Sequence, residues 1–480
     1  MKPLNKRTEE KRTKIVATIG PASDSQEVMT QMMLAGMNVA RLNFSHGKYD
    51  EHARRIARLR EVAQNLDLPL MLLQDLQGPK IRVGELPPEG IQLVEGESLT
   101  LVPMAQYTGQ PNTVAIDYPY VAEEAEAGTQ VLLDDGLLEL RVEKIDGAAV
   151  VCWVVEGGLL KSRKGVNLPS LNLRLPSMTE KDILDLDFGI AQGVDLISLS
   201  FVRKPEDIQA LKALLTEKGA DIPVLAKLEK PQAIANLESI VNECDAIMVA
   251  RGDLGVEMSP EKVPLIQKEI IHLCNQKGIP VITATQMLDS MIYNPRPTRA
   301  EASDVANAIM DGTDAVMLSG ESAVGAYPVE SVKMLARIAK EVESSVDFTN
   351  YPPYHSDDTA AISQALHSLD DTLDLKCIVT FTETGYTAQL ASAERPKAPL
   401  IAYTPHPTIY RRLCLNWGVR PILMKFLKNS LEELLPSIDE DLIGRDFASA
   451  GDKVLIMGGL PMGEAGRTNF LKLHTVKAGG

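Results

Sequence analysis

The stretches LAKLE (residues 225–229) and AIMVARGDLGVE (residues 246–257) decide the fold of this chain. Each begins as an apolar run of strand length and then delivers charge abruptly, with Lys227 and Glu229 in the first and Arg251 and Asp253 in the second. The strands of a closed parallel barrel present catalytic groups in this way, at the end of the barrel where the strands finish. One cation and two carboxylates that converge there indicate a divalent metal ion and an anionic substrate.

Apolar runs of strand length recur along the first two thirds of the chain, and helical-looking segments separate most of them. The runs lie at residues 14–19, 39–44, 70–75, 194–201, 223–228, 246–250, 280–284 and 315–319. Such runs predict parallel strands that are buried on both faces, with crossover helices outside them. The pattern therefore predicts an α/β fold built on a (β/α)8 TIM barrel.

Residues 79–175 break this rhythm. Asp135-Gly136 and Asp146-Gly147 are two turn signals, and the residues between them at 138–142 alternate between apolar and charged. Asp-Gly turns between alternating strands are typical of β-hairpins. We therefore expect an inserted all-β domain that interrupts the barrel after its third strand.

The last part of the chain reads as a separate unit. After Val342 the sequence becomes polar and rich in turn residues (SSVDFTNYPPYHSDDT, residues 344–359), which is typical of a linker. Strand-like runs at 377–381, 400–403, 419–423 and 453–457 then predict a small open α/β domain. The expected units are the barrel at 1–78 and 176–345, the inserted domain at 79–175 and the C-terminal domain at 346–480.

The composition is that of a globular, acidic protein, with 45% hydrophobic residues, 24% charged residues and a formal net charge of -16. Nucleic acids and anionic lipid surfaces need a positive protein surface, so neither is expected as a partner. No run approaches the ~20 apolar residues of a membrane span, and the first residues lack the apolar core of a signal peptide, which predicts a cytoplasmic protein. The 5 cysteines are widely spaced, which indicates isolated core thiols.

Polar residues also end the second and third predicted strands. Arg41, Asn43 and Ser45 alternate, so they share one face of an extended segment. For these three residues alone, a salt bridge and a turn explain the pattern better than a binding site does. Asp75 ends the third strand in the same manner, and taken alone it would be a solvated turn residue.

Lys227 and Glu229 share a face as well, and Asp253 follows the next strand of the barrel. Lys and Glu are seldom buried without partners, so their position at the end of an apolar run requires a ligand or a counterion. Two carboxylates with open positions suit Mg2+ or Mn2+. A purely structural ion pair between Lys227 and Asp253 explains the spacing equally well.

The sixth, seventh and eighth strands end in further candidate groups. Gly252 opens a helix, whose first backbone N–H groups form a ready anion site. Thr285 arrives at the end of the seventh strand, where its hydroxyl could bind a carboxylate or relay a proton, although threonine there is more often only a cap. Residues 319–325 (SGESAVG) end the eighth strand, where barrels often bind phosphate, and a helix cap is the plainer interpretation.

Long motifs spread over the chain resemble the pyruvate kinase family. They are KIVATIGPAS (14–23), ARLNFSHG (40–47), KGVNLP (164–169), KLEKPQ (227–232), ARGDLGVE (250–257), ATQMLDSM (284–291), RPTRAEASDVANA (296–308) and MLSGESAVGAYP (317–328). The resemblance implies Mg2+-dependent phosphoryl transfer from phosphoenolpyruvate to ADP, giving ATP and pyruvate, with the inserted domain closing over the barrel mouth. The chain has no Walker A loop and no Gly-x-Gly-x-x-Gly motif after a strand, so the nucleotide would be held without either.

The same resemblance assigns roles to individual residues. Glu229 and Asp253 would hold the protein-bound Mg2+, or Mn2+ in its place, and a second Mg2+ would arrive with the nucleotide. Arg41 and Lys227 would grip the moving phosphoryl group, whose negative charge spreads over three oxygens in the transition state.

The substrate carboxylate would rest on the backbone amides of Gly252 and Asp253 and on the Thr285 hydroxyl. The groups implied in protonating the enolate are Thr285, a water chain near Ser319 and Glu321, and Lys227 as an alternative acid. The residues implied in binding the nucleotide are Asn43, His46, Arg82 and Lys164, of which His46 could equally be a turn residue.

Many members of this family need K+, and the resemblance places that ion at positions matching Asn43, Ser45, Asp75 and the carbonyl of Leu76. Those members carry Glu where this chain has Lys80. An ammonium near the site could replace the monovalent ion electrostatically. We therefore expect that K+ is not required.

A loop in the last domain matches the position at which the family receives a phosphorylated effector. Its residues are Thr382, Glu383, Thr384, Gly385, Tyr386 and Thr387. Glu383 would repel a highly charged anion, which favours a sugar or nucleotide monophosphate over a bisphosphate. The alternative is an ordinary strand-to-helix turn. The resemblance also implies a homotetramer.

Three classes of function follow from these patterns. The first is the phosphotransferase, the second is a metal-dependent lyase acting on pyruvate or phosphoenolpyruvate on the same barrel, and the third is a non-catalytic metabolite sensor. Arg82 and Lys164 favour the transferase, because a lyase would not need an inserted domain with nucleotide-binding cations. Arg251 is expected only to orient the segment that carries Asp253.

Overall fold

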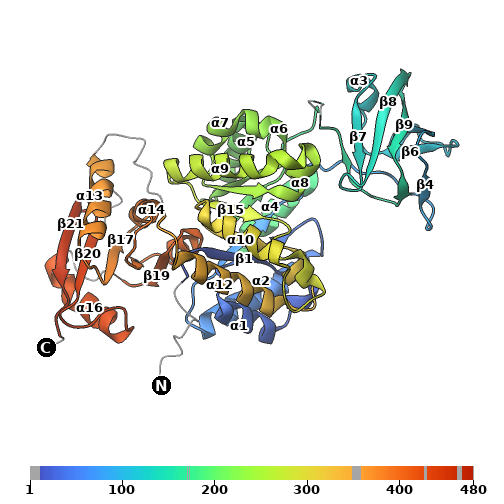
Figure 1. Ribbon diagram of the computed structural model, residues 1–480. Helices are drawn as coiled ribbons and strands as arrows, with labels where there is room; N and C mark the ends of the chain where they lie inside the picture. The colour runs from blue at the N-terminus through green and yellow to red at the C-terminus, as the bar shows by residue number, and fades with distance from the viewer. Residues whose placement is uncertain are drawn as a thin grey trace.

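The computed structural model describes residues 11–169, 171, 173–348, 358–425, 430–461 and 468–478. Within the linker expected at 344–359, residues 349–357 lie outside the described residues. A central barrel lies between the inserted domain and the C-terminal domain (Figure 1). The predicted fold class is confirmed, and the limits expected for each unit stay a prediction.

Eight parallel strands close the barrel in the order β1-β16-β15-β14-β13-β12-β3-β2. They are β1 (Lys14–Thr18), β2 (Val39–Asn43), β3 (Met71–Asp75), β12 (Leu196–Leu199), β13 (Val224–Leu228), β14 (Ala246–Ala250), β15 (Val281–Ala284) and β16 (Ala315–Leu318). Each lies within one of the eight predicted apolar runs. Nearly every residue of these strands is buried, because neighbouring side chains fill the inside and helices cover the outside.

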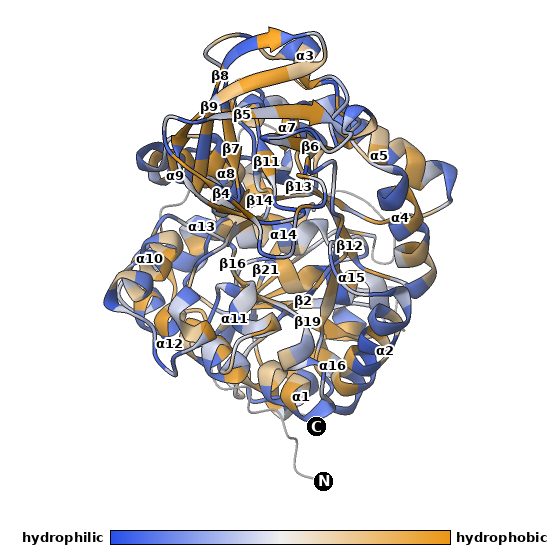
Figure 2. Ribbon diagram, turned by 90° about the vertical axis from the view of Figure 1, so that its right-hand side faces the viewer, coloured by the Kyte–Doolittle hydropathy of each residue, from blue (hydrophilic) through white to orange (hydrophobic). Residues whose placement is uncertain are grey.

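The barrel helices carry both hydrophobic and hydrophilic residues (Figure 2). They are α1 (Gln26–Ala35), α2 (Tyr49–Asn65), α4 (Glu180–Gln192), α5 (Pro205–Glu217), α6 (Pro231–Ala235), α7 (Leu237–Glu243), α8 (Arg251–Glu257), α9 (Val263–Lys277), α10 (Arg299–Met310), α11 (Gly320–Ala323) and α12 (Pro328–Glu343). Local sequence sets their starts: Thr298 and Glu301 form a capping box on α10, which satisfies backbone N–H groups that have no partner within the helix.

The inserted domain is built on a six-stranded sheet in the order β11-β7-β8-β9-β5-β6, with a separate β10-β4 pair. Its strands are β4 (Ile91–Leu93), β5 (Ser98–Pro103), β6 (Thr113–Ile116), β7 (Gln130–Leu133), β8 (Leu138–Asp146), β9 (Ala149–Glu156), β10 (Gly158–Leu160) and β11 (Val166–Asn167). Asp135-Gly136 joins β7 to β8 and Asp146-Gly147 joins β8 to β9, as expected. One short helix, α3 (Val121–Glu124), was not expected.

The C-terminal sheet has the order β19-β18-β17-β20-β21. Its elements are α13 (Asp358–Thr372), β17 (Cys377–Phe381), α14 (Tyr386–Ala393), β18 (Leu400–Thr404), α15 (Pro407–Arg412), η5 (Leu413–Leu415), β19 (Val419–Leu423), α16 (Leu431–Gly444), β20 (Lys453–Gly458) and β21 (Phe470–Thr475). The antiparallel edge strand β21 was not predicted, whereas the other four strands were. Cys414 and Leu415 pack into the apolar cluster at the base of the barrel, so η5 plugs that end.

Candidate active site

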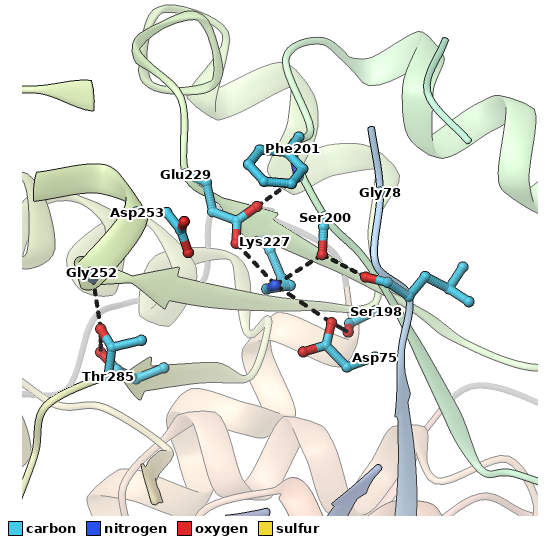
Figure 3. A network of polar contacts seen from close by, with 12 residues as sticks. Asp75, Gly78, Ser198, Ser200, Phe201, Lys227, Glu229, Gly252, Asp253 and Thr285 are labelled. Carbon is cyan, nitrogen blue, oxygen red and sulfur yellow. Dashed lines mark hydrogen bonds and ion pairs between the residues drawn. The ribbon is translucent and has the colours of Figure 1, made fainter. Parts of the chain in front are cut away.

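Lys227 lies at the centre of a polar network at the mouth of the barrel (Figure 3). Its Nζ atom is 2.9 Å from Oε1 of Glu229 and 3.5 Å from Oδ1 of Asp75, and it donates a 2.8 Å hydrogen bond to the Ser200 hydroxyl. The side chains of Lys227, Glu229 and Asp75 are 12%, 1% and 2% exposed. One ammonium is therefore held between two carboxylates with little screening by solvent.

The register of the barrel strands brings these groups together. Ser198 in β12 lies opposite Asp75 in β3 and donates a 2.6 Å hydrogen bond to its Oδ1 atom. Ser200 donates a 2.7 Å hydrogen bond to the Leu76 carbonyl. Neither serine was among the residues expected from sequence, although Ser198 and Ser200 alternate at the end of an apolar run, which is the signal that singled out Lys227 and Glu229.

Burial and charge oppose each other in this network. Burial would raise the pKa of Asp75, but the positive charges of Lys227 and Arg41 hold that pKa below its usual value. Burial would lower the pKa of Lys227, but the carboxylates of Asp75 and Glu229 hold it above its usual value. For Glu229 burial dominates and the negative charge of Asp253 adds to it, so its pKa is raised despite Lys227. Glu229 is thus the carboxylate whose charge a further cation would stabilise.

Asp253 has a different cationic neighbour. Its Oδ1 atom, in the first turn of α8, is 3.6 Å from Nζ of Lys80. The same Nζ atom is 3.5 Å from Oδ1 of Asp135 in the inserted domain. The structural ion pair between Lys227 and Asp253 that the sequence allowed is therefore not formed, because Lys227 pairs with Glu229 and Asp75 instead.

Glu229 and Asp253 fit a divalent cation by their chemistry. They follow neighbouring strands β13 and β14, they offer only hard oxygen ligands, and the charge of Asp253 acts on Glu229. Across the described residues, no group of three or more His, Cys, Asp or Glu side chains could enclose a metal ion. Mg2+ usually keeps water or substrate oxygens beside one or two carboxylates, so a two-carboxylate site suits it.

Thr285 lies across the mouth from Asp75 (Figure 3). Its hydroxyl accepts a 2.7 Å hydrogen bond from the Gly252 N–H and donates a 2.6 Å hydrogen bond to the Ala284 carbonyl. The φ angle of Thr285 is 69°, in the left-handed region. For a β-branched residue this conformation costs about 1–3 kcal/mol, and such strain collects at functional sites. Two of the three groups expected to hold the substrate carboxylate are thus in direct contact.

Arg251 braces this corner of the site. Its guanidinium donates hydrogen bonds to the carbonyls of Ala284 (3.1 Å) and Thr285 (2.8 Å) and lies 2.7 Å from the Asp304 carboxylate. A rigid fork of donors can hold several acceptors at once. Arg251 therefore holds the start of α8 against the strained end of β15. These contacts agree with the expectation from sequence that Arg251 orients the segment that carries Asp253.

Arg41 joins the network through Asp75. Its Nε atom donates a 2.7 Å hydrogen bond to Oδ2 of Asp75, and Nη1 donates a 2.9 Å hydrogen bond to the Thr18 hydroxyl. Asn43 accepts a 3.1 Å hydrogen bond from the Ser45 N–H. Three of the four groups matched to a monovalent-cation site thus already have partners: the Asn43 amide oxygen accepts the Ser45 N–H, Asp75 contacts two cations, and the Leu76 carbonyl accepts the Ser200 hydroxyl.

Glu321 is buried and both of its carboxylate oxygens accept backbone hydrogen bonds. Oε2 accepts the Ser319 N–H at 2.7 Å and Oε1 accepts the Leu288 N–H at 3.0 Å. The carboxylate therefore joins the end of β16 to the segment after β15. The structure places the Ser319 backbone in contact with the Glu321 carboxylate, and the water chain expected near these two residues stays a prediction.

The other residues expected to meet a nucleotide form local contacts. Lys164 lies 2.7 Å from Asp134 within the inserted domain, and Arg82 donates a 3.1 Å hydrogen bond to the Arg163 carbonyl. His46 is exposed, and its carbonyl accepts a hydrogen bond from the His52 ring. In the described part of the chain, none of His46, Arg82 and Lys164 makes a direct polar contact with the Lys227 network.

The candidate effector loop leads from β17 into α14. The Thr382 hydroxyl accepts the Gly385 N–H at 2.8 Å, and the Glu383 carboxylate lies 2.6 Å from the His406 ring. Thr384 and Gly385 line a cavity of about 380 Å³ between the C-terminal domain and the base of the barrel. Lys212 and Arg412 in its lining are already paired with Asp245 and Asp221 respectively.

Two family models match the chain, one described as pyruvate kinase, barrel domain, over residues 10–332 and one as pyruvate kinase, alpha/beta domain, over residues 360–474. A pyruvate kinase of Clostridium acetobutylicum is 43% identical over 475 residues, covering 97% of this chain and 100% of that protein. A pyruvate kinase of Geobacillus stearothermophilus is 46% identical over 474 residues, covering 97% and 80%, and pyruvate kinase 2 of Synechocystis is 46% identical over 478 residues, covering 98% and 80%. None of the helices in the described ranges has the length and apolarity needed to span a membrane.

Proposed function

This chain belongs to the pyruvate kinase family, and we propose that its barrel mouth transfers the phosphoryl group of phosphoenolpyruvate to ADP, giving ATP and pyruvate. The observation that carries the proposal is the buried Lys227 ammonium held between Asp75 and Glu229, beside Asp253 and facing Thr285. Family membership supports the transferase and gives no support to the lyase or to a non-catalytic sensor.

Glu229 and Asp253 would hold the divalent cation, Mg2+ or Mn2+, which when bound supplies positive charge for the substrate oxygens. The amides of Gly252 and Asp253 and the Thr285 hydroxyl would receive the substrate carboxylate. Binding there would exchange the hydrogen bond between the Gly252 N–H and Thr285 for bonds to the carboxylate.

Phosphoryl transfer breaks the bond between phosphorus and the enol oxygen and forms one to the terminal phosphate oxygen of ADP. Lys227 and Arg41 would face the negative charge that develops on the transferred group. Both cations are fixed in advance by Asp75, so little reorganisation accompanies the reaction. This preorganisation is the main contribution of the protein to the rate.

The enolate that remains takes up a proton at its terminal carbon to become pyruvate. Thr285 would deliver this proton together with a water chain near Ser319 and Glu321, and the Glu321 carboxylate accepts the Ser319 N–H. Lys227 stays the alternative acid, although its raised pKa makes it a weak proton donor.

The inserted domain would bring Arg82 and Lys164 to the nucleotide phosphates, which also meet Asn43 and His46, while closure excludes water. Because Arg41 and Lys227 already neutralise Asp75 and because Lys80 adds a charge beside Asp253, we propose that K+ is not required. A cytoplasmic homotetramer, with a phosphate monoester bound at the loop 382–387, completes the proposal.

The test is the formation of pyruvate from phosphoenolpyruvate and ADP, measured with and without Mg2+ and Mn2+. We expect turnover only with a divalent cation and with both substrates present. Pyruvate formed from phosphoenolpyruvate at the same rate without ADP would identify a different activity, and no pyruvate under any condition would overturn the proposal. Titration with sugar and nucleotide monophosphates tests the effector loop, for which activation or a shift in melting temperature is expected.

A further inference from the structure

Glu257 stands at a junction of three segments of the chain. It ends α8, its side chain is 1% exposed, and its Oε1 atom lies 2.6 Å from Nζ of Lys230 and accepts a 2.5 Å hydrogen bond from Nδ2 of Asn167. Lys230 follows β13 in the barrel, whereas Asn167 belongs to β11 of the inserted domain. One buried oxygen therefore receives a donor from each side of the boundary between the two domains.

Two residues of this junction lie close in sequence to the candidate metal ligands, which links the junction to the proposed metal site. Lys230 is the residue after Glu229, and Glu257 lies one helical turn after Asp253 on α8. The ion pair of Lys230 with Glu257 thus ties together the two segments that carry the two metal carboxylates. A change in the length of this tie changes the separation of Glu229 and Asp253.

The inserted domain contacts the same helix along its length. A Cβ atom added to Gly136, in the turn between β7 and β8, would lie 3.5 Å from the Val256 side chain, and Lys80 lies between Asp135 and Asp253. In Figure 1 α8 lies on the side of the barrel from which the chain leaves for the inserted domain. Residues of the inserted domain thus approach α8 at Asp253, Val256 and Glu257.

A small cavity beside Glu257 leaves space in which the side chains of this junction can shift. It measures about 30 Å³, it is lined by Glu257, Lys230, Asn167, Gln232 and Phe201 among others, and it has space for about one water molecule. Oε2 of Glu257 and Oε1 of Gln232 are buried and make no hydrogen bond within the described part of the chain. A buried carboxylate oxygen without a donor is costly, so Oε2 of Glu257 can take up a new donor without breaking a hydrogen bond that it already makes.

We propose that Glu257 is a positioning residue that fixes the spacing of Glu229 and Asp253 through Lys230 and makes this spacing respond to the inserted domain through Asn167. The inference rests on the proposed function, because it assigns the metal to Glu229 and Asp253. Lys230 forms the arm to the barrel and Asn167 forms the arm to the inserted domain. When the inserted domain closes over the substrates, the same movement then changes the spacing of Glu229 and Asp253 and tightens their hold on the metal ion.

The test separates the two arms. Binding of Mn2+ alone is measured from the electron paramagnetic resonance signal of the free ion, and kcat and KM for ADP are measured in parallel. Lys230→Met and Glu257→Gln should weaken Mn2+ binding about tenfold, and Lys230→Arg should restore it. Asn167→Ala should leave Mn2+ binding within about twofold of the wild type but raise the KM for ADP and lower kcat.

The matched control is Glu238→Gln, which removes an ion pair of 3.1 Å with Lys277 between α7 and α9 on the outside of the barrel. This variant should change neither Mn2+ binding nor the kcat and KM for ADP. If Lys230→Met and Glu257→Gln bind Mn2+ as the wild type does, if Asn167→Ala leaves kcat and the KM for ADP unchanged, or if all variants lose activity in proportion to the fall in their melting temperature, the proposal is overturned. If the wild type binds Mn2+ but forms no pyruvate, the proposed function fails while the Mn2+ measurements still decide the role of Lys230 and Glu257.

Discussion

Nζ of Lys227 lies 2.9 Å from Oε1 of Glu229, although the two residues are separated by only one position in the sequence. The two side chains share a face because successive residues of an extended strand point in opposite directions. The group proposed to face the substrate charge and the group proposed to hold the metal ion are thereby built on the end of one strand. Changing one of them necessarily changes the surroundings of the other.

Lys227→Met should lower kcat by about 10²–10³-fold, because a preorganised cation in a site with little water contributes on that scale. Binding of phosphoenolpyruvate in the presence of Mg2+, measured by calorimetry, should be retained, since we propose that Gly252 and Thr285 hold the carboxylate. Lys277→Met, which removes a lysine of α9 that pairs with Glu238 outside the Lys227 network, serves as the control. A kcat close to that of the wild type would remove Lys227 from the reaction.

Arg251→Lys should raise the KM for phosphoenolpyruvate and lower the free energy of unfolding by about 1–3 kcal/mol, because an ammonium cannot reproduce the fork of hydrogen bonds to Ala284, Thr285 and Asp304. The measurements are steady-state kinetics and urea unfolding. Arg445→Lys breaks a comparable contact with Asp441 in the C-terminal domain and should leave the KM unchanged. Equal KM values for the two variants would contradict the bracing role.

Activity in a buffer with tetramethylammonium as the only monovalent cation should be close to that in K+. Lys80→Met should lower the activity without K+ by roughly tenfold, because it removes the charge 3.6 Å from Asp253. Lys144→Met, at an exposed position of the inserted domain, is the matched control. A manyfold activation of the wild type by K+ would show that Lys80 does not replace the monovalent ion.

The cysteines should be unreactive in the folded protein. Burial raises the pKa of Cys152, Cys244 and Cys377 to about 12, so almost no thiolate exists at pH 8. A disulfide reagent should therefore modify all 5 thiols only after unfolding. Because burial raises the pKa of these thiols in the folded state, their contribution to the free energy of unfolding is complete below the ordinary pKa of a thiol. This contribution declines as the pH rises above about 8.5 towards 12. Fast labelling at pH 8 without unfolding would contradict the burial of these side chains.

The sequence predicted the barrel well because a parallel strand covered on both faces leaves a continuous apolar run, as at 246–250. It predicted Lys227, Glu229 and Asp253 as candidates for the same reason. It did not predict β21, whose residues 470–475 form an edge strand with mixed apolar and polar character. An antiparallel edge strand of this kind has too weak a pattern to stand out from its neighbours.

Contacts between separate segments were the part that sequence patterns could not supply. Glu229 lies two residues from Lys227 in the chain, whereas Asp75 lies far from it, and only the register of β3, β12 and β13 decides that Asp75 is the second partner of Lys227. Asn167 and Glu257 are far apart in the chain and belong to different domains. Sequence periodicity cannot predict such a contact, because the contact depends on how two folded domains pack against each other.

The closure of the barrel has a consequence for how the chain folds. β1 pairs with β16, so Lys14 must find Ala315 before the barrel is complete. The six-stranded sheet of the inserted domain draws all of its strands from the contiguous segment 98–167. Pairings over short stretches form faster than those that close a long loop. During synthesis the inserted domain can therefore finish its sheet while the barrel that surrounds it in sequence is still open, and the part of the molecule that we propose closes over the substrates is the first that can fold.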